Sequence, residues 1–377
     1  MKIAVPKEAG QGERRVALVP ESAARLVKAG MAVAVEDGAG SEAGFDNDAY
    51  ESAGATIVGT RQGLLSDADL VLSVRQLPDV DIPVLKNGAA QIGMLRPLTS
   101  PEHVNLLARA GVSALAMELV PRITRAQKMD SLSSQATAAG YKAVLLAAAG
   151  HGKFFPMLMT AAGTVPPARV LVLGAGVAGL QAIATARRLG AVVQGFDIRP
   201  AVKEQVESLG AQWVGMELAE AEGTGGYAAE VSEETQRQEH EHLAKLIADA
   251  DVVITTAQIP GRPAPVLITT DMVDGMKAGS VIVDLAAESG GNCELTRPDE
   301  EVRHGRARIL GPTDLAGGTQ IHASQMYSRN VEALVQHITK DGALNIDRED
   351  EIVRECLITD AGQIVHPRVS ATVQQER

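Results

Sequence analysis

The stretch RVLVLGAGVAGLQAIATARRLGAVVQGFDIRP, residues 169–200, decides the fold class of this chain. An uninterrupted apolar run leads into the glycine at position 174, and a helical pattern follows the glycine at position 179. A second apolar run ends at Asp197. Apolar runs of this length on both sides of a helix are typical of two buried parallel strands joined by a crossover. The stretch therefore predicts a βαβ unit.

The glycines of this unit follow the spacing G-x-G-x-x-G, which is typical of dinucleotide sites. The first glycine permits a tight turn, the second lets the backbone approach a pyrophosphate, and the third lets helix and strand touch. Asp197 lies 23 positions after Gly174, close to the offset of about 20 expected for a carboxylate that accepts ribose hydroxyls. Because an acid repels a 2′-phosphate, we predict NAD(H) rather than NADP(H), a preference that Arg199 weakens. The predicted cofactor contacts are Gly174, Ala175, Gly176, Val177, Ala178, Gly179, Asp197, Ile198 and Arg199.

Further α/β alternation extends on both sides of this unit. Expected strands before it are 2–6, 32–37, 67–74, 89–95 and 112–119, and expected strands after it are 191–198, 251–257, 280–286 and 307–312. Helices are expected at 20–30, at 100–111 with Ser100 as the cap, at 135–150 and at 328–340, with an extended piece at 356–367. We predict two Rossmann-like doubly wound parallel-sheet domains with the NAD site in the cleft between them. The expected domains are 1–130 plus about 320–377, which is discontinuous, and 131–319.

Composition excludes several classes of protein. The net charge of −12 over 377 residues argues against a nucleic-acid surface. Only two cysteines occur, which favours a reducing compartment, and neither they nor His103, His240 and His242, expected to be solvated, have the spacing of a metal site. The N-terminus lacks a secretory signal, and the longest uncharged run, 170–186, is too short to span a bilayer. No direct membrane insertion is expected.

A polar stretch, PRITRAQKMDSLSSQ at 121–135, stands between apolar segments. It has two interpretations. It could be a solvated loop that caps the following helix through Asp130 or Ser131. It could also offer amide, hydroxyl and guanidinium groups to the nicotinamide end of a dinucleotide. A second loop, 258–269, follows an expected strand and is assigned to the cofactor side, with Gln258 as a contact.

These motifs together resemble the NAD(H)-binding component of the proton-translocating nicotinamide nucleotide transhydrogenases, in the alanine dehydrogenase/transhydrogenase superfamily. The resemblance covers nearly the whole chain. The segments that carry it include MKIAVPKE, ERRVALVPE, AMELVPRITRAQKMDSLSSQ, FFPMLMTAAGTVPPARVLVLGAGVAGLQAIATARRLGAVV, KEQVESLGA and IVDLAAESGGN.

The resemblance implies an oxidoreductase, a Re/Si-specific NAD(P)⁺ transhydrogenase alpha subunit, in which hydride passes directly from the NAD(H) bound here to NADP(H) on a beta subunit. It assigns Arg122, Gln127, Asp130 and Ser133 to orientation of the nicotinamide and its ribose, and Tyr227 to a mobile loop that closes over NAD. Hydride transfer between two nicotinamide rings moves no proton, so no general acid or base is required. The resemblance also implies a homodimer at the inner, cytoplasmic face of the cell membrane, held there by separate membrane-spanning subunits that translocate protons.

Two alternatives remain. An alanine dehydrogenase would need a catalytic histidine, and the aligned position holds Arg96; Arg15 and Glu288 match its carboxylate-binding and acid positions, while the roles of Arg15, Arg75, Arg96 and Glu288 stay open. A non-catalytic NAD-sensing module would bind the dinucleotide without turnover.

Overall fold

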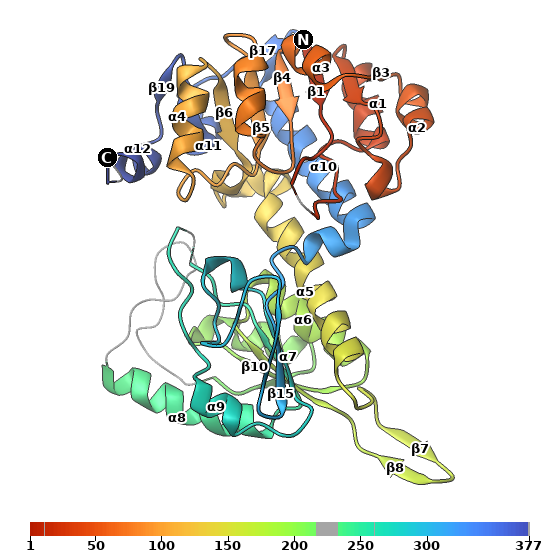
Figure 1. Cartoon of the computed structure of the whole chain (residues 1–377), viewed down its shortest axis with the longest axis vertical. Coiled ribbons are helices and arrows are strands. Elements are labelled where there is room, and N and C mark those ends of the chain that lie inside the picture. Colours follow the sequence, from red (N-terminus) through yellow and green to blue (C-terminus); the bar gives the residue numbers. More distant parts are fainter. Residues whose placement is uncertain (11, 216–232, 260, 376–377) are drawn as a thin grey trace. The chain divides into compact units, whose positions relative to one another are not determined.

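The computed structural model describes residues 1–10, 12–215, 233–259 and 261–375 (Figure 1). By contacts between residues, the chain divides into two compact units. Unit 1 comprises Met1–Gln135 and Gly317–Arg377, and unit 2 comprises Ala136–Ala316. Each unit is built around its own sheet.

Unit 1 holds an eight-stranded sheet in the order β19-β18-β6-β5-β4-β1-β2-β3 within the described residues. Its first six strands in chain order are all parallel and run 3-2-1-4-5-6 across the sheet, the doubly wound order. Its strands are β1 (Lys2–Val5), β2 (Ala32–Glu36), β3 (Thr56–Val58), β4 (Leu70–Leu72), β5 (Ala90–Gly93), β6 (Ser113–Ala116), β18 (Leu357–Asp360) and β19 (Gln363–Ile364). The prediction of a purely parallel sheet is wrong at one edge, because β18 pairs antiparallel with β6 and with β19.

The helices of unit 1 include two that the sequence predicted closely. The α-helices are α1 (Pro20–Lys28), α2 (Asn47–Ser52), α3 (Arg61–Ser66), α4 (Pro101–Arg109), α10 (Gln320–His337), α11 (Glu351–Cys356) and α12 (Pro367–Gln375). Short 3₁₀ turns are η1 (Ser41–Ala43), η2 (Asp79–Val84), η3 (Met117–Leu119), η4 (Thr124–Met129) and η8 (Ala316–Thr319). At α4, Pro101 begins the helix as expected, but the Ser100 side chain makes no cap hydrogen bond.

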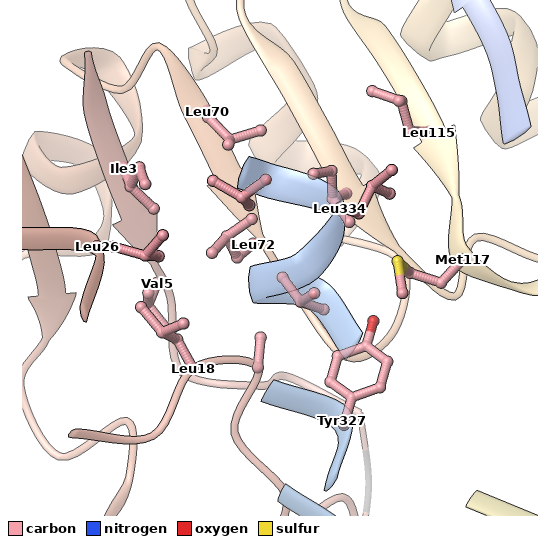
Figure 2. Close-up of a cluster of buried hydrophobic side chains, with 14 of the residues drawn as sticks. Ile3, Val5, Leu18, Leu26, Leu70, Leu72, Leu115, Met117, Tyr327 and Leu334 are labelled. Carbon is pink, nitrogen blue, oxygen red and sulfur yellow. The ribbon is translucent and has the colours of Figure 1, made fainter. Parts of the chain in front are cut away.

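Helix α10 completes the core of unit 1 although it follows unit 2 in the chain. Figure 2 shows Leu334 and Tyr327 of α10 close to Leu72, Leu115 and Met117, and all of these side chains are buried in one cluster. The Tyr327 hydroxyl donates to the carbonyl of Ser73, just after β4, over 2.8 Å. The core of the first 135 residues therefore depends on a helix near the other end of the chain.

Unit 2 holds a seven-stranded sheet in the order β11-β10-β9-β12-β13-β15-β14 within the described residues. Its strands are β9 (Arg169–Leu173), β10 (Val192–Phe196), β11 (Gln212–Trp213), β12 (Val252–Thr255), β13 (Val281–Asp284), β14 (Glu301–His304) and β15 (Ala307–Leu310). All pairs are parallel except β14 with β15, so the parallel strands again run 3-2-1-4-5-6. The strand order reverses between β9 and β12, where ligands of such sheets bind beyond the carboxyl ends.

The remaining elements of unit 2 cover this sheet or extend from it. The helices are α6 (Val177–Arg188), α7 (Lys203–Ser208), α8 (Glu233–Asp249) and α9 (Thr270–Asp274), with the 3₁₀ turns η5 (Pro200–Val202) and η7 (Ala287–Ser289). A hairpin of β7 (Leu158–Thr160) and β8 (Gly163–Val165), which the sequence did not predict, extends away from the sheet of its own unit (Figure 1). A separate small hairpin in unit 1 pairs β16 (Thr339–Lys340) with β17 (Ala343–Leu344). Helix α5 (Ser131–Gly150) contains the boundary between the two units.

Candidate dinucleotide site

The turn that follows β9 has the geometry predicted for the first glycine of the fingerprint. Gly174 adopts φ +95°, a left-handed conformation that favours glycine. Its N–H donates to the carbonyl of Phe196 at the end of β10, over 2.8 Å. A Cβ at this position would also lie 2.6 Å from Oγ1 of Thr256, which follows β12. The turn is thus fixed at the point where the strand order reverses.

Helix α6 begins at Val177, two residues earlier than the sequence suggested, with Gly176 as its N-cap. No side chain of the described residues caps its first turn, and Gly176 and Val177 are exposed. A Cβ at Gly176 would meet no described atom within 4 Å. Uncapped N–H groups and the positive end of the helix dipole suit a phosphate.

Gly179 plays a different structural role from Gly176. It is buried in the first turn of α6, where an added Cβ would overlap the carbonyl oxygen of Gly174. A similar close approach occurs between helices, because a Cβ at Gly140 of α5 would overlap the carbonyl oxygen of Ala178. These two glycines let the fingerprint helix pack closely.

Asp197 follows β10 directly and is 6% exposed. Its Oδ2 accepts from the N–H of Ala175, over 2.8 Å, and so connects the strand end to the glycine turn. Its carboxylate also pairs with the guanidinium of Arg199 at 2.8 Å. The adjacent Ile198 packs partly buried against the core under α8 and α9.

Two residues that sequence reasoning did not single out arrange the loops after β12 and β13. Asp284 is fully buried and accepts from Oγ1 of Thr255 and from the N–H of Asn292, at 2.8 and 2.7 Å. Asn292, also fully buried, exchanges hydrogen bonds with the N–H and carbonyl of Ala257. An aspartate at the end of an apolar strand was the available signal. These contacts place Gln258 beside them, exposed, with its amide on the carbonyl of Leu285 at 2.7 Å.

In unit 1, the polar stretch forms η4 and the start of α5. Ala126 and Met129 are buried in the unit 1 core, three positions apart on the 3₁₀ turn. Arg122 and Gln127 are exposed. The apolar pair anchors the turn so that the polar groups between its members face outward.

Asp130 and Ser133 bind to each other at the start of α5. Asp130 accepts from the N–H of Ser133 at 2.9 Å and from its hydroxyl at 2.6 Å. The structural interpretation of Asp130 as a helix cap is therefore correct, and a further role toward nicotinamide stays a prediction. Asn330 of α10 supports the same segment through the carbonyl of Lys128 and the hydroxyl of Ser134.

Charged groups gather at the carboxyl end of the unit 1 sheet. Arg15 is 3% exposed and binds both carboxylate oxygens of Glu13 and the side-chain oxygen of Gln135. Arg75 also pairs with Glu13, at 2.7 Å, and the two guanidinium groups help to lower the pKa of Glu13 to about 2 against its burial. Arg96 adopts φ +49° and its N–H donates to Glu118. The contacts of Arg15 and Arg75 are those of structural charges.

The other predicted residues have mixed outcomes. Tyr227 and the glycines before it lie outside the described residues. Glu288 is exposed on η7. The expectation that His103 is solvated is wrong, because it is 6% exposed and its Nδ1 lies 2.8 Å from Asp79.

Within the described ranges, no three His, Cys, Asp or Glu side chains are grouped to hold a metal ion. No described helix combines the length and apolar character needed to cross a membrane.

Comparisons with known proteins agree with this geometry. The model of the alanine dehydrogenase/PNT N-terminal domain matches residues 4–139, and that of the C-terminal domain matches residues 143–367. In Rhodospirillum rubrum, NAD(P) transhydrogenase subunit alpha is divided into parts. The chain is 48% identical to the first of these over 381 aligned positions, which cover 98% of this chain and 99% of the relative.

Two solved structures share the fold along nearly the whole chain. A transhydrogenase from Sinorhizobium meliloti superposes with a TM-score of 0.89 at 44% identity, covering 97% of this chain and all of that one. An L-alanine dehydrogenase superposes with a TM-score of 0.86 at 27% identity, with both chains fully covered. The doubly wound α/β architecture is common to all three.

Proposed function

The chain belongs to the alanine dehydrogenase/PNT family, and on that premise we propose that it is the NAD(H)-binding component of a proton-translocating transhydrogenase. Its NAD(H) passes hydride directly to NADP(H) held by a beta subunit, and separate membrane-spanning subunits couple this transfer to proton movement. We propose that the component is a homodimer held peripherally at the cytoplasmic side of the cell membrane by those subunits. The identity with a transhydrogenase alpha polypeptide over nearly the full length of both chains favours this function.

The observation that carries the dinucleotide site is the exposed, uncapped N-terminus of α6. Its N–H groups lie beside the glycine turn, which the N–H of Ala175 connects to Asp197. An anion that stabilises these N–H groups completes the helix. The pyrophosphate of NAD(H) supplies that anion, and the adenosine ribose lies toward Asp197.

The hydride transfer itself requires orientation. Two nicotinamide rings exchange hydride without an alkoxide or a free proton, so the protein has to align the rings and exclude water. Alignment of this kind lowers a barrier by roughly 7–11 kcal/mol in well-oriented systems. Arg122 and Gln127, exposed on the turn that Ala126 and Met129 anchor, are suited to hold the carboxamide and ribose. Asp130 and Ser133 complete the set at the start of α5.

The test is a reconstituted transfer assay. The purified chain is mixed with a beta subunit and NADH, and reduction of an oxidised NADP analogue is followed. We expect turnover only when both proteins are present, and no oxidation of alanine with NAD⁺ alone. Alanine oxidation would instead establish an alanine dehydrogenase, the function of a family relative with the same fold. Binding of NADH without any transfer would establish a sensing module.

Within this assay, Gln127→Asn tests the orienting segment. Shortening the side chain by one methylene should leave NADH affinity within a few-fold and slow transfer about a hundredfold, because a misplacement of about 1 Å has that effect. Lys128→Gln, exposed on the same turn, is the matched control and should transfer at the normal rate. An unchanged rate in Gln127→Asn would remove the orienting role.

A further inference from the structure

The carboxylate of Asp197 is already bonded on both of its oxygens. Oδ1 accepts from the N–H and from Nε of Arg199, each over 2.9 Å. Oδ2 accepts from the second guanidinium branch of Arg199 and from the N–H of Ala175, each over 2.8 Å. With the residue only 6% exposed, ribose hydroxyls reach it only by replacing some of these donors.

Arg199 is the donor that can be replaced. The N–H of Ala175 belongs to the turn that Gly174 fixes, whereas the guanidinium ends a long side chain that is 19% exposed. Arg199 approaches the carboxylate with two branches, the fork geometry that guanidinium offers equally to carboxylate and phosphate. The pair as a whole carries no net charge, so it repels a 2′-phosphate less than Asp197 alone would.

We propose that Arg199 is a specificity-determining residue, and that with Asp197 it forms a latent 2′-phosphate site at the adenosine end of the dinucleotide. This inference rests on the proposed binding of NAD(H) at the fingerprint. With NAD(H), the ribose hydroxyls take the place of the guanidinium on Asp197. With a 2′-phosphorylated dinucleotide, the phosphate competes with Asp197 for the guanidinium. Selectivity for NAD(H) therefore measures how strongly Asp197 holds Arg199.

The chain contains a built-in reporter for this end of the site. Trp213 is its single tryptophan, and it lies on β11, where it pairs with Gly195 of β10. Asp197 follows two residues later on the same strand end. Tryptophan fluorescence during titration with ADP-ribose and with 2′-phospho-ADP-ribose isolates the adenosine end, because neither ligand carries nicotinamide. Calorimetric titration gives the same two dissociation constants independently of the reporter.

Three variants of the full chain separate the two side chains. Asp197→Asn keeps an acceptor for Ala175 but releases Arg199, so affinity for 2′-phospho-ADP-ribose should rise about tenfold or more and affinity for ADP-ribose should fall. Arg199→Ala removes both the phosphate partner and the competitor for Asp197. Its affinity for 2′-phospho-ADP-ribose should fall about tenfold, while ADP-ribose should bind as tightly as before or a few-fold tighter. Arg199→Lys keeps the charge without the fork and should lie between the original chain and Arg199→Ala.

The ratio of the two dissociation constants decides the matter. If that ratio is the same in the original chain, in Asp197→Asn and in both Arg199 variants, the inference is overturned while the fingerprint site stands. If the original chain binds neither ligand, the proposed function fails together with it. Thermal unfolding of each variant shows whether it is folded, and Arg199→Lys supplies the answer should Arg199→Ala not fold.

Discussion

Two glycines of one fingerprint, three positions apart, have opposite surroundings. The space beside Gly176 is open, whereas Gly179 touches the carbonyl of Gly174. One glycine therefore leaves room for a ligand, and the other leaves room for the fold itself. The motif alone does not separate these two roles.

This contrast gives a paired prediction. Gly176→Ala should keep its thermal stability, since its φ of −77° suits alanine and the added methyl meets no described protein atom within 4 Å. Its NADH affinity should fall about tenfold or more, because the methyl occupies the approach of the pyrophosphate. Gly179→Ala, the matched partner, should instead lose about 2 kcal/mol or more of folding free energy. Calorimetry and NADH titration of both variants check this, and equal stability losses would contradict it.

A second residue-scale prediction concerns pH. Glu118 lies on η3 just after β6, its Oε2 is buried with no hydrogen-bond partner among the described residues, and burial raises its pKa to about 7. Unfolded, the same carboxyl has a pKa of about 4.5. Between these values the folded state binds more protons than the unfolded state, so folding stability falls as pH rises through that window.

Glu118→Gln should remove much of that fall. We expect the variant to lose on the order of 2 kcal/mol less stability than the original chain between about pH 5 and about pH 8. Glu102→Gln, exposed on α4, is the control and should follow the original pH profile. Denaturant unfolding at the two pH values measures the difference. Parallel profiles for Glu118→Gln and the original chain would show that this carboxyl does not titrate in the window.

At the scale of elements, the apolar runs predicted the buried strands well. β9, α6 and β10 lie where the stretch 169–200 placed them. The missed elements have weak local signals, since the hairpin 158–165 is largely exposed and β18 pairs with a strand that precedes it by more than two hundred residues. The sequence marked the polar segment of the site, but not the partners that hold it. His103 shows the same limit, because its burial depends on packing against distant Asp79.

The partner of that polar segment is α10, through Asn330. This side chain is 8% exposed, donates to the carbonyl of Lys128 at 2.8 Å, and accepts from the hydroxyl of Ser134 at 2.7 Å. Asn330→Ala should slow hydride transfer about tenfold and leave NADH affinity within a few-fold, because a small displacement affects transfer more than binding. Transfer and binding assays on the same preparation check this split. A loss of affinity equal to the loss of rate would show general damage instead, and Asn330→Gln should restore some of the rate.

At the scale of the whole molecule, the two units have separate apolar clusters around separate sheets. Both sheets have the doubly wound order, as the α/β alternation predicted. The sequence could not predict their edges, because an antiparallel edge strand depends on which distant segment pairs there. The roles of Arg122, Gln127 and Asp197 toward a dinucleotide stay predictions from motif and resemblance.

Hydrogen exchange can test how the ligand acts on each unit. ADP-ribose should protect amides of the fingerprint segment 169–200 by up to about 2.7 kcal/mol at a hundredfold excess over its dissociation constant. It should leave residues 122–133 unchanged, since it lacks nicotinamide. NADH should add protection at 122–133. The same protection of 122–133 by both ligands would separate that segment from nicotinamide.

The late position of α10 in the chain has a consequence for synthesis. The ribosome releases the first 135 residues long before Tyr327 and Leu334, which fill their core, have been translated. Nascent residues 136–316 hold a complete sheet and can fold earlier, since domains generally fold as units during synthesis. The segment of the polypeptide that is made first is therefore finished last, and until then it leaves apolar strands open to chaperones.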